Sequence, residues 1–143
     1  MDKYIPSPSR WVAEQVELYE GSGGTDGTTL KGLPVIIVTN RGRKTGAIRK
    51  TPLMRVVDGN RYVLVASRGG APKHPLWYHN IKANPAITIQ VGRERLAYTA
   101  REVDADTKRE LWPHLVSLYP DFDEYQARTD RDIPVFCCEP TAP

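Results

Sequence analysis

The sequence has little of what covalent cross-links and metal sites require. Only two of the 143 residues are cysteines, Cys137 and Cys138, and they are neighbours, whereas a disulfide framework needs separated pairs. Because neighbouring residues on a strand point to opposite faces, we expect one thiol to be buried and the other to lie at the surface. The three histidines, His74, His79 and His114, lack the spacing of metal ligands, so we predict no metal site.

Long hydrophobic runs are also absent. No stretch approaches the roughly 20 apolar residues that a membrane-spanning helix needs, and residues 1–9 lack the charged-then-apolar order of a signal peptide. We therefore expect a cytoplasmic protein made of one domain, which the 143 residues and the charged fraction of 26% also indicate. Contact of an N-terminal helix with a membrane surface is a weaker alternative, because Glu14, Glu17 and Glu20 would oppose anionic lipid.

A large excess of charge is missing as well, since the formal net charge is only +3. Yet Arg41, Arg43, Lys44, Arg49 and Lys50 fall within ten residues that contain no acid. The two glycines of this turn let backbone N–H groups approach an anion, and arginine and lysine suit phosphate or carboxylate. The turn therefore predicts an anion site, with a solvated hairpin tip as the alternative. It is neither a Walker loop nor a dinucleotide-binding glycine motif.

The pattern of apolar residues predicts a mainly β domain with flanking helices. We expect a short amphipathic helix from Ser7 and Pro8 to Gly21, followed by a glycine-rich loop. Residues 1–30 would then be a helix and tether that act as a lid on the domain formed by residues 31–143. Six strands, mostly antiparallel, indicate a closed or split barrel and are expected at 35–39, 48–57, 62–66, 86–91, 95–103 and 133–138.

Proline and capping signals refine these elements. Pro52 places its strand at a sheet edge or at a bulge. Asp104 or Asp106 should begin a helix that runs through Leu111 and that Pro113 bends or ends. Two further short helices are expected at 77–82 and 122–128.

Several aromatic residues could line a site for a flat molecule. Trp77 and Tyr78 follow a strand that ends at Ser67, and they lie at the start of a helix whose positive end favours an anion. Phe122 and Tyr125 are three residues apart, so they share one face of a helix and could wall a flat pocket. Ordinary packing in the core is the alternative for each of these rings.

Taken together, these segments resemble the deazaflavin-dependent nitroreductase family of actinobacteria. The resemblance implies a split β-barrel of the flavin-mononucleotide-oxidase type. It also implies coenzyme F-420 as cofactor, a deazaflavin with a phosphate-lactate arm and a tail of glutamates. The matching runs occur in order between about Gly32 and Phe136, and they are Gly42–Gly46, Arg49–Met54, Val65–Ser67, Gly69–Pro72, Pro75–Asn80, Ala100–Val103, Tyr125–Gln126 and Thr129–Phe136.

The resemblance assigns residues to the cofactor. Those expected to meet its anionic arm are Arg43, Lys44, Thr45, Arg49 and Lys50. Those expected to edge the deazaflavin ring are Thr51, Pro52, Leu53, Met54, Val65, Ala66, Ser67 and Arg68. Those expected to close the cofactor site are Leu76, Trp77, Tyr78, His79 and Asn80, with Tyr125 covering it.

Three residues are expected on the acceptor side. Ser67 and Tyr125 are the candidate catalytic residues, since either hydroxyl could hydrogen-bond an acceptor oxygen on which negative charge develops. Phe122 completes the substrate site. It stands where family members that activate nitroimidazoles tend to carry tyrosine, which puts nitroimidazole reduction in doubt.

The implied function is hydride transfer from the reduced deazaflavin to a small, flat, electron-poor acceptor. Quinones, conjugated lactones such as coumarins, and nitroaromatics are the expected classes. A non-catalytic deazaflavin binder or carrier stays open, as does an oxidase that uses flavin mononucleotide. A nucleic-acid-binding barrel is the weakest alternative, because the charge is only mildly basic and no strand interleaves aromatic residues. The sequence leaves the oligomeric state open.

Overall fold

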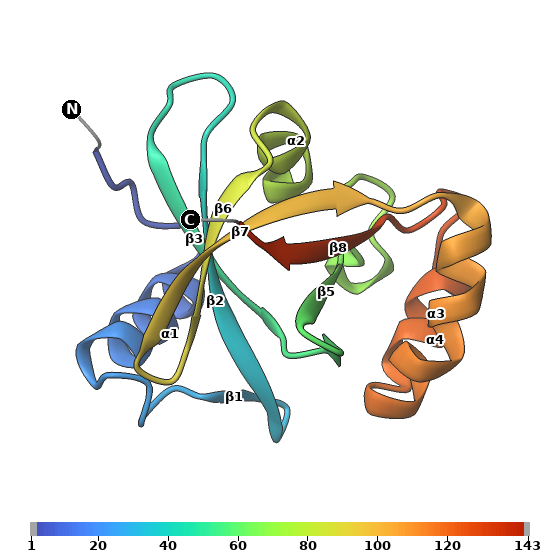
Figure 1. Ribbon diagram of the computed structural model, residues 1–143, viewed down its shortest axis with the longest axis horizontal. Helices are drawn as coiled ribbons and strands as arrows, with labels where there is room; N and C mark the ends of the chain where they lie inside the picture. The colour runs from blue at the N-terminus through green and yellow to red at the C-terminus, as the bar shows by residue number, and fades with distance from the viewer. Residues whose placement is uncertain (1–2, 142–143) are drawn as a thin grey trace.

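Antiparallel pairing organises the fold of residues 3–141, which are the residues that the computed structural model describes (Figure 1). One sheet of eight strands runs in the order β1-β2-β6-β7-β8-β5-β4, and β3 also pairs with β2. The strands are β1 Thr29–Leu30, β2 Leu33–Arg41, β3 Ile48–Met54, β4 Val57–Asp58, β5 Arg61–Val65, β6 Ala86–Val91, β7 Glu94–Glu102 and β8 Val135–Pro140. The structure thus adds two short strands, β1 and β4, to the six that the sequence predicts.

The sheet curves toward a barrel but does not close. Strand β3 contacts β5 without a hydrogen-bonded ladder between them, because β3 pairs with β2 and, through Ile48, with Tyr4, whereas β5 pairs with β4 and β8. Pro52 lies on β3 opposite Ile37, which confirms its expected place on an edge strand. The open seam between β3 and β5 is where the cavity described below lies.

The helices cover the outside of this sheet. They are α1 Arg10–Gly21, α2 Leu76–Ala83, α3 Ala105–Leu118 and α4 Asp121–Arg128, with one 3-10 turn at Arg68–Gly70. Figure 1 shows α3 and α4 together at one end of the molecule, α2 above the sheet and α1 near its other end. Within residues 3–141, no helix has the length and hydrophobicity that crossing a membrane would require.

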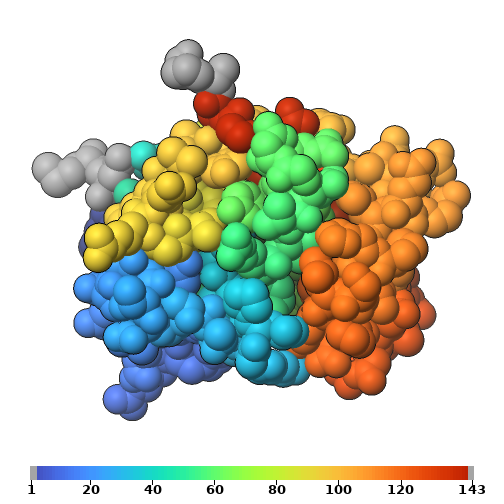
Figure 2. Space-filling view, turned by 60° about the horizontal axis from the view of Figure 1, so that its bottom comes forward, coloured from blue at the N-terminus to red at the C-terminus, as the bar shows by residue number. Residues whose placement is uncertain are grey.

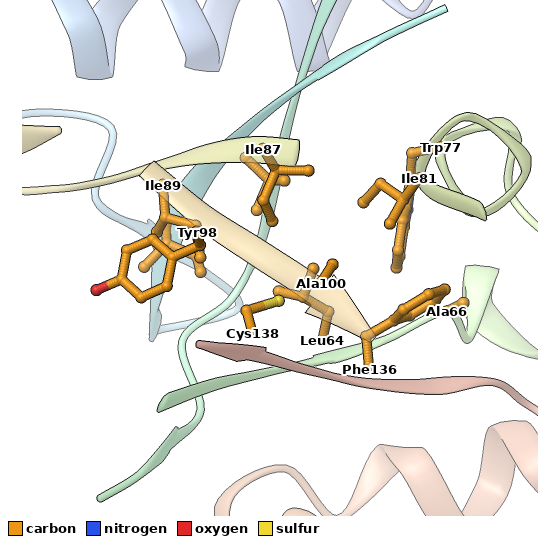
Figure 3. Packing of buried hydrophobic residues seen from close by; sticks show 12 residues of the cluster. Leu64, Ala66, Trp77, Ile81, Ile87, Ile89, Tyr98, Ala100, Phe136 and Cys138 are labelled. Atoms are coloured by element: carbon orange, nitrogen blue, oxygen red, sulfur yellow. The ribbon is translucent and has the colours of Figure 1, made fainter. Parts of the chain in front are cut away.

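Two hydrophobic clusters lie on the two faces of β8. Figure 3 shows one of them, in which Phe136 and Cys138 meet Trp77 of α2 and residues of β5, β6 and β7. The other cluster contains Val135 and Cys137 with residues of α3 and α4. Both thiols are therefore buried, and the expectation of one surface thiol is wrong, because packed elements cover both faces of this strand.

Helix α1 packs on β2 through its second half. Val16 and Tyr19 are buried against Val35 and Ile37, and the Tyr19 hydroxyl accepts the backbone N–H of Gly92 at 3.0 Å. The helix begins at Arg10, later than expected, and Ser9 rather than Ser7 stands at the N-cap position. Ser7 does not cap the helix because its hydroxyl instead accepts the N–H of Ser9 at 3.1 Å and forms a turn before the helix begins.

Helix α3 is longer than the sequence predicts. Asp104 is its N-cap and accepts the N–H of Thr107 at 2.8 Å, so Asp106 lies inside the first turn. The helix continues through Pro113 to Leu118. Pro113 and Arg109 are both exposed, so water can satisfy the Arg109 carbonyl that loses its helical partner, and the proline does not end the helix.

Candidate functional site

A cavity of about 540 Å³ opens at the seam between β3 and β5. Its walls are formed by the N-terminal segment with α1, the β1–β2 hairpin, β3, the end of β5, the start of α2, and α4. Figure 2 shows the face on which the light-blue β1–β2 segment lies against the orange helices α3 and α4. The lining residues are Ser7, Pro8, Trp11, Val12, Leu30, Lys31, Arg49–Met54, Val56, Val65, Ser67–Gly69, Pro75–Trp77, Asn80, Tyr119, Phe122 and Tyr125.

The strand side of the cavity has an apolar floor and a cationic rim. Pro52, Leu53 and Met54 of β3 line the floor, and Arg49 and Lys50 precede them on the same strand. The ammonium of Lys50 lies 2.7 Å from a carboxylate oxygen of Glu20 on α1, so this cation is paired within the protein. A flat apolar ring and an anionic group are the chemistry that such a surface can accept together.

The rest of the basic turn lies beside the cavity rather than in its wall. Arg43, Lys44 and Thr45 are exposed on the turn between β2 and β3. The backbone N–H of Arg43 donates to Asn80 Oδ1 at 3.0 Å, and Asn80 lines the cavity. The turn is therefore tied to the site through α2, and a long anionic ligand that leaves the cavity past Arg49 would reach it.

Besides Arg43, Lys44 and Thr45, three more residues expected to contact the cofactor lie outside the cavity wall: Ala66, Tyr78 and His79. Ala66 points into the core because it alternates with Val65 and Ser67, which face the cavity. The Tyr78 hydroxyl donates to Glu102 at 2.9 Å, and burial first, then this hydrogen bond, raises the pKa of Tyr78 to about 12. His79 packs edge-to-face against the Tyr78 ring. Tyr78 and His79 lie on α2 between the cavity-lining positions 76–77 and 80, so they project from another face of the helix.

The helical side of the cavity is aromatic. Phe122 is only 3% exposed, and its ring centroid lies 4.8 Å from that of Tyr119 in an edge-to-face contact. The hydroxyls of Tyr119 and Tyr125 lie 2.8 Å apart, and Lys31 donates to Tyr125 at 3.1 Å. Phe122 and Tyr125 thus share a wall, as their spacing predicts. Sequence reasoning missed Tyr119, because it lies between α3 and α4, outside the helix to which the spacing argument applies.

Arg131 fixes the loop that carries Ser67. Its guanidinium donates to the carbonyl of Ser67 at 2.6 Å and to that of Ala71 at 2.7 Å, and it lies 2.9 Å from His74 Nδ1. Burial, and then the charge of Arg131, lower the pKa of His74, so a neutral imidazole accepts the N–H. Nothing local in the sequence marks Arg131 for this role, because its partners are 57 or more residues away.

Gly70 allows α4 to lie against the same loop. Its φ is +79°, and a Cβ added there would be 2.6 Å from the carbonyl oxygen of Tyr125. No ordinary side chain fits at that distance. The Ser67 loop and the aromatic wall are therefore held at a fixed separation by this backbone contact.

Comparison with known proteins identifies the family. The family model described as "F420H(2)-dependent quinone reductase" matches residues 11–140. This chain belongs to that family. It is similar to an F420H(2)-dependent quinone reductase of Mycobacterium tuberculosis, with 38% identity over 141 residues that cover 89% of this chain and 94% of the relative. Reduced coenzyme F-420 is thus its cofactor, as the sequence predicts, and the chain is a reductase.

Solved structures agree with this placement. An F420-H2-dependent reductase is 47% identical and covers 74% of this chain and 94% of its own, with a TM-score of 0.69. A structure described as a domain-swapped dimer is 46% identical and covers 93% of this chain and 100% of its own, with a TM-score of 0.72. A protein of the pyridoxine-phosphate oxidase family from Clostridium acetobutylicum, at 20% identity, covers 89% of this chain and 81% of its own, with a TM-score of 0.52. The fold is accordingly the predicted split β-barrel.

The donor set of the cavity fits this cofactor. The anionic arm needs several cations, and Arg49, Lys50 and Arg68 line the rim. The deazaflavin ring needs a flat apolar surface, which β3 provides over Pro52 to Met54. No acid is among the residues that line the cavity, although Glu20 pairs with Lys50 from behind the rim.

Proposed function

We propose that the protein transfers a hydride from reduced coenzyme F-420 to a quinone bound between the cofactor and the aromatic wall of α4. When bound, the cofactor supplies the hydride. The chain binds the anionic arm with Arg49, Lys50 and Arg68, and it holds the ring along β3. The observation that supports this proposal is the convergence of a cationic, flat-floored side and an aromatic side on one cavity.

Narrower substrate preferences follow from two side chains. Phe122 presents a ring edge without a hydroxyl, which favours apolar flat acceptors over polar nitroimidazoles. The hydroxyl of Ser67 is available to polarise a conjugated carbonyl. We therefore extend the proposal to conjugated lactones such as coumarins, with nitroaromatics reduced more slowly.

A fluorescence titration tests the choice of cofactor. The protein should bind the deazaflavin more tightly than flavin mononucleotide. The cationic rim and the adjoining turn offer more positive charges than the single phosphate of flavin mononucleotide can use. Tighter binding of flavin mononucleotide would favour the oxidase alternative. Mixing the reduced cofactor complex with a soluble naphthoquinone then separates an enzyme, which reoxidises the cofactor within one turnover, from a carrier, which leaves it reduced.

The first half of the N-terminal segment is proposed as a lid. Ser7, Pro8, Trp11 and Val12 line the cavity, and Trp11 is 54% exposed. Trp11→Ala should therefore raise KM for bulky quinones while leaving the stability almost unchanged. Leu18→Ala is the matched control, because Leu18 is 52% exposed and lies away from the cavity. An equal effect of both variants on KM would exclude the lid.

Contact of α1 with a membrane surface is a separate proposal. Trp11 and Leu18 are seven residues apart, so these two exposed apolar side chains lie on one face of the helix. Co-sedimentation with zwitterionic vesicles should be weakened by Trp11→Ala. Unchanged sedimentation would remove this role, and it would leave the quinone reductase proposal as it is.

A further inference from the structure

Three side chains from separate segments meet at the mouth of the cavity. Lys31 lies at the tip of the β1–β2 hairpin, Tyr119 follows the end of α3, and Tyr125 lies on α4. The Lys31 ammonium donates to the Tyr125 hydroxyl at 3.1 Å, and the Tyr125 and Tyr119 hydroxyls are 2.8 Å apart. Asp121 lies 3.4 Å from the same ammonium. This group is called the Lys31 cluster below.

The backbone at Lys31 is unusual for a lysine. Lys31 and Gly32 form the two-residue turn between β1 and β2, and both have positive φ, +53° and +76°. Asparagine and glycine are the residues that such a turn favours. A lysine in this conformation lowers the stability of the fold relative to asparagine at the same position. Its retention is therefore consistent with a role for its side chain.

Hydrogen-bond directions in the cluster leave one proton free. Lysine only donates, so the Tyr125 oxygen accepts from Lys31. When the Tyr119 hydroxyl also donates to that oxygen, the proton of Tyr125 is directed away from both neighbours. Tyr125 lines the cavity, so a bound acceptor can receive this proton. Two accepted hydrogen bonds, one from a cation, make a phenol a stronger donor.

The charges around the cluster favour a proton donor. Burial, and then the bond to Tyr125, raise the pKa of Tyr119 to about 12, and the positive charge of Lys31 opposes that rise. The hydrogen bonds to the two phenols also raise the pKa of Lys31, which stays charged. The other charged groups at the cluster are Asp121 and Arg128, whose guanidinium lies 5.6 Å from the Tyr125 ring centroid.

We infer that Lys31 is a positioning residue that makes the Tyr125 hydroxyl the proton donor to the reduced acceptor. The inference rests on the proposed quinone reduction. After a hydride adds its two electrons, one acceptor oxygen carries negative charge. The Tyr125 O–H bond then breaks and an O–H bond forms on that oxygen. Lys31 keeps its positive charge and stabilises the tyrosinate, which then takes up a proton from solvent.

Binding of a nitrophenol to the cofactor-free protein tests this without turnover, since the colour of the ligand reports its ionisation. The native protein should bind the phenolate more tightly than the phenol, by about fivefold or more for one charge-assisted contact. Lys31→Met should abolish this preference, and so should Lys31→Asn, which suits the turn backbone and keeps the hairpin folded. In a Tyr125→Phe background, Lys31→Met should have no further effect.

Lys82→Met is the matched control. Lys82 is 51% exposed and pairs with Glu102 at 3.1 Å, much as the 57% exposed Lys31 pairs with Asp121. This variant removes one positive charge away from the cavity and should keep the phenolate preference. Absence of the preference in the native protein, or an equal loss in Lys82→Met, would overturn the inference.

Kinetics with reduced F-420 and a soluble naphthoquinone separate the inference from the proposed function. Lys31→Met should lower kcat by about tenfold or more with little change in KM or in cofactor affinity, and Lys31→Arg should restore most of the rate. Unchanged kcat in Lys31→Met would refute the role of Lys31 alone. Failure of the native protein to reduce any quinone would refute the proposed function, whatever the nitrophenol result.

Discussion

The two sides of the cavity are held in place in different ways. On the strand side, β3 pairs with β2 along its whole length, from Ile48 opposite Arg41 to Met54 opposite Val35. On the helical side, α4 is attached by separate contacts, such as the approach of Gly70 and the bond from Lys108 to Gln126 at 2.8 Å. A ladder distributes the effect of a substitution, whereas a single contact does not. We therefore expect substitutions on the helical side to leave the strand side undisturbed.

The largest expected effect is the loss of stability on substituting Gly70. If this loss is not observed, the two sides of the cavity are not held in place differently. Gly70→Ala should lower the free energy of unfolding by about 2–4 kcal/mol, because the new Cβ would overlap the Tyr125 backbone at an unfavourable positive φ. Gly46→Ala on the strand side is the control, since it has φ +72° and no neighbour within 4 Å. It should cost about 1 kcal/mol. Urea unfolding of both variants measures the difference, and equal losses would mean that only the backbone conformation matters.

Cofactor affinity should depend on the strand side. Arg49→Ala should weaken F-420 binding by about tenfold, the effect of about 1.4 kcal/mol, because Arg49 lines the cavity. Lys44→Ala should weaken it less, and its effect should decline at high salt, because Lys44 is on the exposed turn. Fluorescence titration at two salt concentrations checks both. A larger effect of Lys44→Ala would place the anionic arm over the turn instead.

Acceptor choice should depend on the helical side and the Ser67 loop. Phe122→Tyr should raise nitroimidazole turnover by restoring a hydroxyl, and it should leave F-420 affinity unchanged. Ser67→Ala should slow carbonyl acceptors by about fivefold to tenfold, because one hydrogen bond is lost in the transition state. Steady-state rates with one lactone, one quinone and one nitroimidazole test this. A change in cofactor affinity in Phe122→Tyr would show that the two sides are not independent.

The smallest expected effect concerns the cap of α3, which supports the aromatic wall. The N–H of Thr107 lowers the pKa of Asp104 below its usual value of 3.8, so the cap stabilises the fold above that pH and less as pH falls. Asp104→Ala should lower Tm by a few degrees at pH 7 and by less near pH 3. Asp106→Ala is the control in the same turn. A pH-independent difference in Tm would mean that the carboxylate charge is not involved.

Local patterns predicted the strand side and the shared wall of Phe122 and Tyr125, but not the long-range contacts of the helical side. Pro52 predicted either an edge position or a bulge for β3, and the density of cations from Arg41 to Lys50 predicted the positive charge beside it. Lys31 and Arg131 carry no such local signal, since their partners lie 57 or more residues away along the chain. Tyr78 and His79 project from another face of α2 than Leu76, Trp77 and Asn80, which line the cavity. Helical periodicity separates these faces, but only the packing of α2 against the sheet decides which of them meets the cavity.

The order in which strands pair along the chain has a consequence for how the molecule is made. Strand β8 lies between β7 and β5, and β5 has no other long partner. Val65 and Ser67 at the end of β5 therefore cannot take their place until residues 135–140 have been synthesised. A nascent chain that stops before β8 leaves β5 without its main partner and leaves unpaired the edge of β7 that faces away from β6. Placement of Val65 and Ser67 is thus a late event in folding, and chaperone protection before that point would act on these two edges.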